Sequence, residues 1–417
     1  MEKILRIRKI VFIAFFVIFI IGAVLVGFYS NGWRFDLKSF SFEKTGAIFV
    51  ETIPRDVNIK VDGKTFKDKS GPLSSGTLIS NLLPETYKIE INKNGFFSWY
   101  KNLSVKPTQV SEAINVILIP NNITKDIFFN SQKISDFIIG PKEKLIFKSN
   151  SKLYFNEPKD IPTKLKGDVL VEISNDEAKA IVKNSTANTF YLYDLKSPIS
   201  STTINTIVAK FDAKMKIKNI NFHPFDSKRI IFESDEGLYS LDTDSSKAET
   251  IFDANKKPFL WKLIGSKVYF FSAQESGFFN LVFKTKTTLP LPLFDLLKTT
   301  KVFTISPDGK KIAFIDQNNK LKIYFLDDQI KGFAQKSGDV IILNLKNSSV
   351  IKNISWYFDS LHLFVEYTNE VYFTEIDNRE PINSYLIDSG LSKFHYEIST
   401  NLLYFLKDGF IYRWQIK

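Results

Sequence analysis

The feature that most restricts the fold of this chain is a repeat that occupies residues 121–417. Each unit contains an apolar run, a polar turn, a second apolar run, a short turn and a third run rich in aromatic residues. The second apolar runs begin at Leu145, Ala180, Ile230, Val268, Ile312, Leu363 and Leu403. The steps between these residues average about 43, which is the period of a four-stranded propeller blade. The repeat therefore predicts a β-propeller.

The number of units sets the expected number of blades. Seven units predict seven blades, with six or eight as the alternatives. A solenoid would have a shorter and more constant period. Because a ring must join its first and last blades, we expect a strand near Ile127–Phe129 to complete the last blade. Such closure would leave no free sheet edges.

The extreme N-terminus predicts a membrane span. Residues 10–29 read IVFIAFFVIFIIGAVLVGFY and hold no charge. Twenty helical residues reach about 30 Å, the thickness of the hydrocarbon core of a bilayer. Residues 1–9 are basic, so the positive-inside rule predicts a cytoplasmic tail and a single-pass signal anchor, with the rest of the chain extracytoplasmic. A cleavable signal peptide is the alternative.

Residues 30–46 follow the apolar run and show a two-residue alternation. Trp33, Phe35 and Leu37 alternate with polar residues, and Phe40 and Phe42 continue the pattern. This period predicts an extended linker with one apolar face.

Residues 47–120 predict a small antiparallel β-sandwich. Short alternating apolar runs are separated by turn signals such as Asp62-Gly63 and Asn94-Gly95, with no helical segment between them. Asp62-Gly63 is typical of a tight hairpin because both residues tolerate a positive φ. Together with the propeller and the apolar helix, this module gives an all-β fold class, in keeping with the 40 phenylalanines of the chain.

The same module resembles the PEGA domain of membrane-anchored bacterial surface proteins. The positions that match the pattern of this family are Gly46, Pro54, Asp62, Gly63, Pro84, Tyr87, Gly95 and Trp99. The chain departs from the family at its naming tetrad, which is Pro54-Arg55-Asp56-Val57 here, and at Pro84-Glu85, where the family has Pro-Gly. Members of this family are surface modules without catalytic residues, so the resemblance implies a structural or binding role.

The segment 301–314, KVFTISPDGKKIAF, is the one stretch that invites a catalytic interpretation. Pro307-Asp308-Gly309 is a turn sequence between two strands, and no helix follows that would present N–H groups to a phosphate. We therefore expect a turn in which Lys310 and Lys311 face water. ISPDGKKIAF is similar to the repeat of TolB-like propellers, which are related in architecture to WD-like ones.

The sequence offers little for catalysis or for metal binding. The chain has no cysteine and three histidines, His223, His362 and His395, and neither G-x-S-x-G nor H-E-x-x-H occurs. Asp242 and Asp244 suit a strand-end turn better than a calcium site, which needs several more oxygens. His223 precedes Pro224 in a turn, so we expect it to cap the turn or to pack against its neighbours, and not to bind a ligand. The sequence thus predicts no catalytic residue, no metal and no cofactor, and it does not identify ligand-binding residues.

Two functions remain open for such a chain. The first is a non-catalytic, membrane-anchored scaffold of the cell envelope that contacts the lipid bilayer through residues 10–29 and binds envelope proteins or anionic surface polymers. The net charge of +11, about +8 of it beyond the N-terminal tail, favours anionic partners, but the chain lacks the basic stripes with aromatics that nucleic-acid binding needs. The alternative is an envelope hydrolase or lyase with its site in the propeller funnel. Inward-facing carboxylates would favour the enzyme, and a funnel filled by Phe, Tyr and Leu would favour the scaffold.

Overall fold

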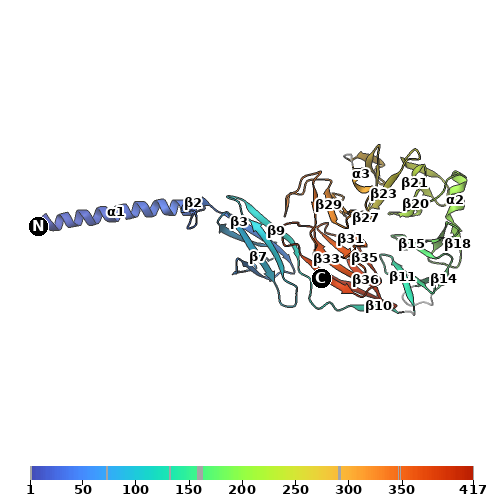
Figure 1. Ribbon diagram of the computed structural model, residues 1–417, viewed down its shortest axis with the longest axis horizontal. Coiled ribbons are helices and arrows are strands. Elements are labelled where there is room, and N and C mark those ends of the chain that lie inside the picture. Colours follow the sequence, from blue (N-terminus) through green and yellow to red (C-terminus); the bar gives the residue numbers. More distant parts are fainter. Residues whose placement is uncertain are drawn as a thin grey trace. The chain divides into compact units, whose positions relative to one another are not determined.

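The computed structural model describes residues 2–71, 74–130, 133–156, 163–289, 293–345, 347 and 349–416, with the backbone alone for residues 2–6. The chain divides into two compact units. The first comprises Met1–Asn121 with two short later segments, Ile330–Ala334 and Arg379–Asn383, and the second comprises the rest of the chain. Each unit is described by itself below (Figure 1).

The first unit begins with a long helix, α1 (Glu2–Ser30). Its segment Ile7–Ser30 has a mean hydropathy of 3.2, and none of it is buried against the rest of the protein. Within the described residues it is the one helix long and apolar enough to cross a bilayer. A helix of this kind serves either as a membrane anchor or as a signal sequence.

The segment after α1 folds back on itself. Strand β1 (Trp33–Asp36) pairs antiparallel with β2 (Ser41–Lys44), with Trp33 opposite Lys44 and Phe35 opposite Phe42. Both halves are extended, as the alternation predicts, but they form a hairpin and not a single linker strand. The aromatic residues fall on one face because successive side chains in a strand point to opposite sides.

The remainder of the first unit consists of two sheets that enclose one core. The four-stranded sheet has the order β5 (Lys64–Lys67), β4 (Asn58–Val61), β7 (Thr86–Asn92), β8 (Trp99–Ser104). The three-stranded sheet has the order β6 (Thr77–Leu82), β3 (Gly46–Ile53), β9 (Val110–Ile117). Ile48, Ile59, Ile91 and Leu103 are fully buried between them. As expected, Asp62 and Gly63 form the two-residue turn between β4 and β5, with φ of 45° and 81°.

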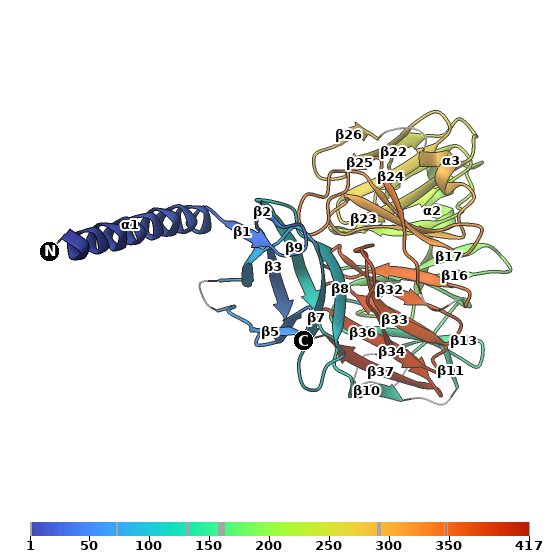
Figure 2. The ribbon, with the colours of Figure 1, turned by 60° about the vertical axis from the view of Figure 1, so that its left-hand side comes forward.

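One pairing corrects the prediction of a wholly antiparallel sandwich. Strand β9 runs parallel to β3, with Ala47 opposite Val110 and Ile53 opposite Ile117, and the two lie side by side in Figure 2. A parallel pair needs a long crossover connection, which the strands β4 to β8 supply here. Reasoning from short turns identifies only neighbouring antiparallel strands, so it missed this pair.

The described residues of the second unit contain seven antiparallel sheets of four strands. Six of them consist of strands consecutive in the chain. The first two are β11 (Ile134–Ile139), β12 (Leu145–Ser149), β13 (Lys152–Asn156), β14 (Thr163–Leu165), and β15 (Val169–Ile173), β16 (Lys179–Asn184), β17 (Thr189–Asp194), β18 (Ser201–Thr203). The next two are β19 (Ile220–His223), β20 (Asp226–Glu233), β21 (Gly237–Asp242), β22 (Ala248–Asp253), and β23 (Phe259–Ile264), β24 (Lys267–Ser272), β25 (Ser276–Asn280), β26 (Thr285–Thr288). The fifth and sixth are β27 (Val302–Ile305), β28 (Lys311–Ile315), β29 (Leu321–Phe325), β30 (Val340–Ile342), and β31 (Asn353–Trp356), β32 (His362–Glu366), β33 (Glu370–Glu375), β34 (Ser384–Ser389).

The last sheet combines the two ends of the unit. Strands β35 (Lys393–Glu397), β36 (Leu402–Lys407) and β37 (Phe410–Gln415) are completed by β10 (Asp126–Asn130), which pairs with β37. Ile127 lies opposite Tyr412, so the pairing predicted near Ile127–Phe129 is present. Two short helices, α2 (Ile204–Phe211) and α3 (Leu293–Leu297), connect β18 to β19 and β26 to β27.

The core of the second unit lies between neighbouring sheets. All seven residues used to align the repeats fall in the second strand of a different sheet, where the burial is nearly complete. Separate apolar clusters join successive sheets, and one of them joins the first sheet to the last through Phe137, Phe147, Tyr404 and Ile411. Figure 1 shows the sheets following one another around a common centre, where the first strands β11 and β15 contact each other, as do β11 and β35. This arrangement is that of a β-propeller.

The SPDGKK segment forms a turn, as expected, but one of its lysines is not in water. The Oγ of Ser306 donates to Asp308, and the backbone N–H of Lys311 donates to Ser306 Oγ at 2.9 Å. Lys310 is exposed and pairs with Asp327. Lys311 is only 2% exposed, and its Nζ lies 2.9 Å from Asp308 Oδ2. The prediction that Lys311 faces water was wrong because it is the first residue of β28, where every side chain is buried.

Replacement of Asp308 should therefore destabilise the second unit. In Asp308→Ala the ammonium of Lys311 stays buried without its partner, which we expect to cost about 3 kcal/mol of unfolding free energy. Asp327→Ala is the matched control. It removes the exposed partner of Lys310, a lysine of the same turn as Asp308, and should cost less than about 1 kcal/mol. Urea unfolding of the two variants measures the difference. Equal losses would mean that the buried pair contributes no more than the exposed one.

Candidate functional site

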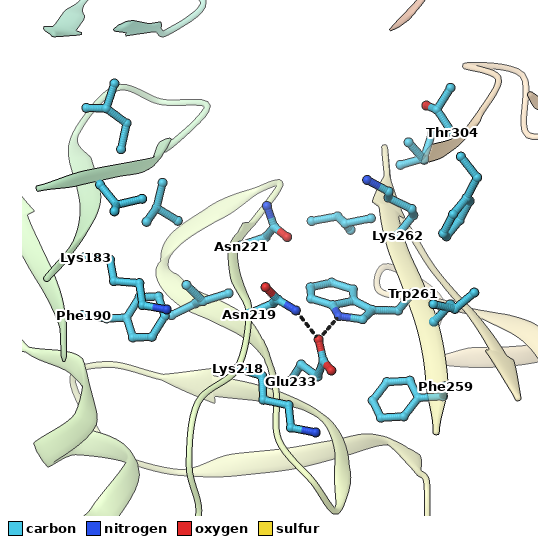
Figure 3. Close-up of a pocket in the computed structure, with 18 residues that line it drawn as sticks. Lys183, Phe190, Lys218, Asn219, Asn221, Glu233, Phe259, Trp261, Lys262 and Thr304 are labelled. Carbon is cyan, nitrogen blue, oxygen red and sulfur yellow. Dashed lines mark hydrogen bonds between the residues drawn. The ribbon is translucent and has the colours of Figure 1, made fainter. Parts of the chain in front are cut away.

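A pocket of about 770 Å³ opens on the inner strands of the second unit (Figure 3). It lies among the first strands β15, β19, β23 and β27, which line the centre of the propeller. The residues that line it are Val169, Leu170, Val171, Lys183, Phe190, Lys218, Asn219, Ile220, Asn221, Glu233, Phe259, Leu260, Trp261, Lys262, Leu263, Ile264, Phe303 and Thr304. A propeller funnel is a common place for a ligand because the inner strands bring side chains from several sheets together.

Trp261 projects from β23 and is held in place by hydrogen bonds. Its Nε1 donates to Glu233 Oε2 at 2.9 Å, and the Nδ2 of Asn219 donates to the same oxygen at 2.5 Å. Figure 3 shows both bonds converging on the Glu233 carboxylate. Two backbone hydrogen bonds hold the main chain of Glu233 beside the start of β19, because Glu233 N donates to Asn219 O and Lys218 N donates to Glu233 O, each at 2.8 Å. The indole, which lines the pocket, is thus held in one orientation.

Three lysines place positive charge in the pocket. The Nζ of Lys183 lies 4.9 Å from the centre of the Phe190 ring, and Lys218 forms an exposed pair with Asp235 at 2.6 Å. Lys262 differs from both. Its Nζ lies 5.7 Å from the centre of the Phe303 ring, and no ion pair found among the described residues involves it. Its side chain lines the pocket and remains accessible to solvent, and partial desolvation lowers the pKa of Lys262.

A half-buried carboxyl lies next to the pocket. Glu172 on β15 accepts a hydrogen bond from the backbone N–H of Phe222 at 2.6 Å and one from Asn221 Nδ2 at 3.3 Å. Burial raises the pKa of Glu172 from 4.5 to about 7, although these two hydrogen bonds act in the opposite direction. Glu172 therefore changes its protonation state near neutral pH.

The raised pKa makes the stability of the propeller depend on pH. The folded chain holds the proton of Glu172 more tightly than the unfolded chain does, so stability should fall as the pH rises from about 4.5 to about 7. Glu172→Gln mimics the protonated form at every pH. At pH 8 we expect this variant to be more stable than the wild type by about 3 kcal/mol, and at pH 4 the two should be equal. Urea unfolding at both pH values measures this.

The control for this experiment is Glu249→Gln, which changes an exposed carboxylate paired with Lys284. It should shift the stability by less than about 0.5 kcal/mol at either pH. A Glu172→Gln variant with the same pH dependence as the wild type would show that Glu172 does not titrate in this range.

The residues singled out in the sequence lie away from this pocket. His223 caps a turn, as expected, because its Nδ1 accepts from the N–H of Phe225 at 3.3 Å. Asp242 ends β21 and accepts from the N–H groups of Asp244 and Ser245, which is the expected strand-end turn. His362 lies 2.6 Å from Asp359 in another turn. Where the structure describes the chain, no three His, Cys, Asp or Glu side chains gather in a group suited to a metal ion.

The pocket residues themselves were not identified from the sequence. The strand that carries Trp261 and Lys262 reads FLWKLI, so the available signal was a single lysine inside an otherwise apolar run. The pocket is neither lined by a group of carboxylates, as expected for an enzyme, nor filled by Phe, Tyr and Leu alone, as expected for a scaffold. It combines Trp, Phe and Leu with three lysines, and Glu233 is the acidic member of its lining.

Comparisons with known proteins extend the description only as far as the fold. No protein-family model matches the chain, and no curated protein matches it. Among solved structures, the chain is similar to the β-propeller domain of Cps50 (Swd1) from Myceliophteria thermophila, with 8% sequence identity and a TM-score of 0.46. The match covers 70% of this chain and all of that domain. So distant a likeness carries no argument about function, and the assignment to the propellers rests on the sheet order described above.

Proposed function

We propose that this protein is a non-catalytic binding protein of the cell envelope, which α1 anchors in the membrane with its N-terminus in the cytoplasm. Its second unit would be a closed seven-bladed propeller on the extracytoplasmic side, and residues 47–120 a PEGA-like surface module. In this proposal the pocket binds an anionic segment of an envelope protein or surface polymer. The basic residues that precede the uncharged segment 10–29 support the orientation. The net positive charge of the remaining chain supports an anionic ligand.

The observation that carries the proposal is the state of Lys262. The Nζ of Lys262 lies in the pocket lining, 5.7 Å from the centre of the Phe303 ring, and no ion pair found among the described residues involves it. Partial desolvation there lowers the pKa of Lys262. An anionic ligand would restore the lost interaction, and in a partly desolvated site a charge-assisted hydrogen bond is stronger than in water. Trp261 and Phe303 on either side offer flat apolar surfaces to the carbon skeleton of the same ligand.

One observation favours the alternative, an envelope hydrolase or lyase. The carboxyl of Glu172, with its pKa near 7, has the property of a general acid or base. Its carboxylate, however, already accepts from Phe222 and Asn221, which ties it to the wall of the propeller. The geometry thus fits a structural carboxyl better than one that transfers protons to a ligand.

Equilibrium binding to defined polyanions tests the proposal. The full chain, reconstituted in lipid nanodiscs, is titrated with a fluorescent poly-L-glutamate and with inorganic polyphosphate, and poly-L-glutamine serves as the neutral control. We expect saturable binding of at least one polyanion that weakens steeply above physiological salt, where the Debye length is about 8 Å. Equal binding of the neutral polymer, or binding insensitive to salt, would contradict the proposal. Turnover of either probe would favour the enzyme.

A further inference from the structure

The apolar surface of α1 continues without a break onto the hairpin that follows it. The ring of Phe28, in the last turn of α1, lies 5.9 Å from that of Trp33 and 5.4 Å from that of Phe42. The ring of Phe35 lies 5.2 Å from that of Phe42 and 6.4 Å from that of Phe40 (centre to centre). These rings form a row that leads from the end of the helix along one face of the hairpin to its tip. We refer to Phe28, Trp33, Phe35, Phe40 and Phe42 as the aromatic row.

No residue of the first unit that the structure describes covers the outer end of this row. Phe40 is 78% exposed, and Leu37, beside it in the turn, is 75% exposed. Phe35 and Phe42, which lie directly opposite each other in the two strands, are each more than 40% exposed. Isolated exposed apolar residues are ordinary, but a contiguous group of this size marks a surface for another apolar phase or partner.

The other face of the hairpin is polar and is held by the protein. Arg34 donates from Nη1 to the carbonyl of Tyr29 at 2.9 Å and from Nη2 to Asn81 Oδ1 at 2.9 Å, and its guanidinium lies 3.5 Å from the centre of the Tyr29 ring. At the tip, Lys38 pairs with Glu85 at 2.6 Å. The hairpin is therefore fixed both to the end of α1 and to the sandwich strands of the same unit, with its aromatic row turned outward.

We infer that the aromatic row lies in the interfacial layer of the outer leaflet and holds the hairpin against the lipid headgroups. This inference rests on the proposed anchoring by α1, since the hairpin begins three residues after the helix ends and its face continues the apolar surface of the helix. Aromatic side chains concentrate at this depth of a bilayer. Lys44, whose Nζ lies 5.6 Å from the centre of the Trp33 ring, provides a cation for a lipid phosphate on the same face.

Because the chain has no cysteine, single labels can test this placement directly. A polarity-sensitive fluorophore is attached to Leu37→Cys, Phe40→Cys, Ser41→Cys or Phe19→Cys in the full chain, in nanodiscs with or without a phospholipid carrying a nitroxide near its headgroup or along its acyl chains. Ser41 is the matched control, since it adjoins Phe40 but belongs to the polar face of the hairpin. Phe19 reports whether α1 is in the bilayer. The headgroup nitroxide should quench labels 37 and 40 roughly threefold more than label 41, and the acyl-chain nitroxide should quench label 19.

The outcomes separate the hairpin from the anchor. Quenching at position 19 without quenching at 37 and 40 would overturn the inference and leave the anchor in place, and it would assign the exposed row to a protein partner. Equal quenching at 37, 40 and 41 would contradict the inference that the aromatic face of the hairpin, and not its polar face, is turned toward the lipid. A label at 19 that is not quenched would overturn the membrane anchor and the inference together.

Discussion

A chain truncated after Gly390 is expected to lose the folded state of its second unit. The truncation removes β35, β36 and β37, three of the four strands of the sheet that joins the two ends of the propeller, and it leaves β10 without a partner. Tyr404, Phe405 and Leu406 are fully buried in that sheet. Loss of each large buried side chain costs about 3–5 kcal/mol, while a whole domain is stable by only about 5–15 kcal/mol.

Limited proteolysis and thermal unfolding of the purified full-length and truncated chains measure this effect. The truncated chain should be cleaved throughout residues 121–390 and should show no cooperative transition from the propeller. Phe283→Ala, at a side chain that is 75% exposed, is the control and should behave like the wild type. A truncated chain that unfolds cooperatively at the wild-type temperature would mean that the sheets form an open array and not a ring.

Lys262→Glu is expected to weaken the binding of a polyanion about a hundredfold. The substitution replaces the attraction between Lys262 and the ligand with repulsion, at a position of the pocket lining where no ion pair found among the described residues engages the lysine. Lys262→Met keeps the length of the side chain and removes only the charge. Its affinity for the polyanion should therefore lie between that of the wild type and that of Lys262→Glu. Titration of the nanodisc-bound chain with poly-L-glutamate, together with a thermal unfolding control for each variant, measures the difference.

The control for this prediction is Lys310→Glu, which reverses an exposed lysine in the turn before β28. An exposed charge mainly affects the association rate, so the affinity should change by no more than about threefold. Equal losses for the two reversals would show that the ligand responds to the overall charge of the protein and not to the pocket.

The repeat contained most of the information needed to predict the second unit. Ile230 and Leu363, for example, begin runs that can be buried on both faces, and such runs form the second strands of the sheets. The period of the repeat then sets four strands to a sheet. Predictions failed where the outcome depended on contacts distant in sequence. Lys311 resembles a surface lysine until β28 is placed among its neighbours, and the parallel partner of β3 is about sixty residues away along the chain.

The candidate site was less predictable than the fold, because its residues come from several sheets. Trp261, Asn219 and Glu233 show no motif along the chain, and only the packing of β19, β20 and β23 brings them together. The lysine inside FLWKLI was visible, but the sequence alone cannot show whether such a side chain points into a funnel or out to water. Residues that turns position, such as His223 and Asp242, were predictable because their partners lie within a few residues.

The central claim is that an anionic envelope component occupies the pocket of the propeller. Its most direct test is photo-crosslinking in intact membranes from a benzoylphenylalanine that replaces Phe259, a residue of the pocket lining, with the same probe at the exposed Phe283 as the control. The account predicts that the adduct at position 259 contains an acidic protein segment or an anionic polymer, is displaced by poly-L-glutamate, and is lost in Lys262→Glu. An adduct with a neutral or basic partner, or one formed equally well in Lys262→Glu, would contradict it.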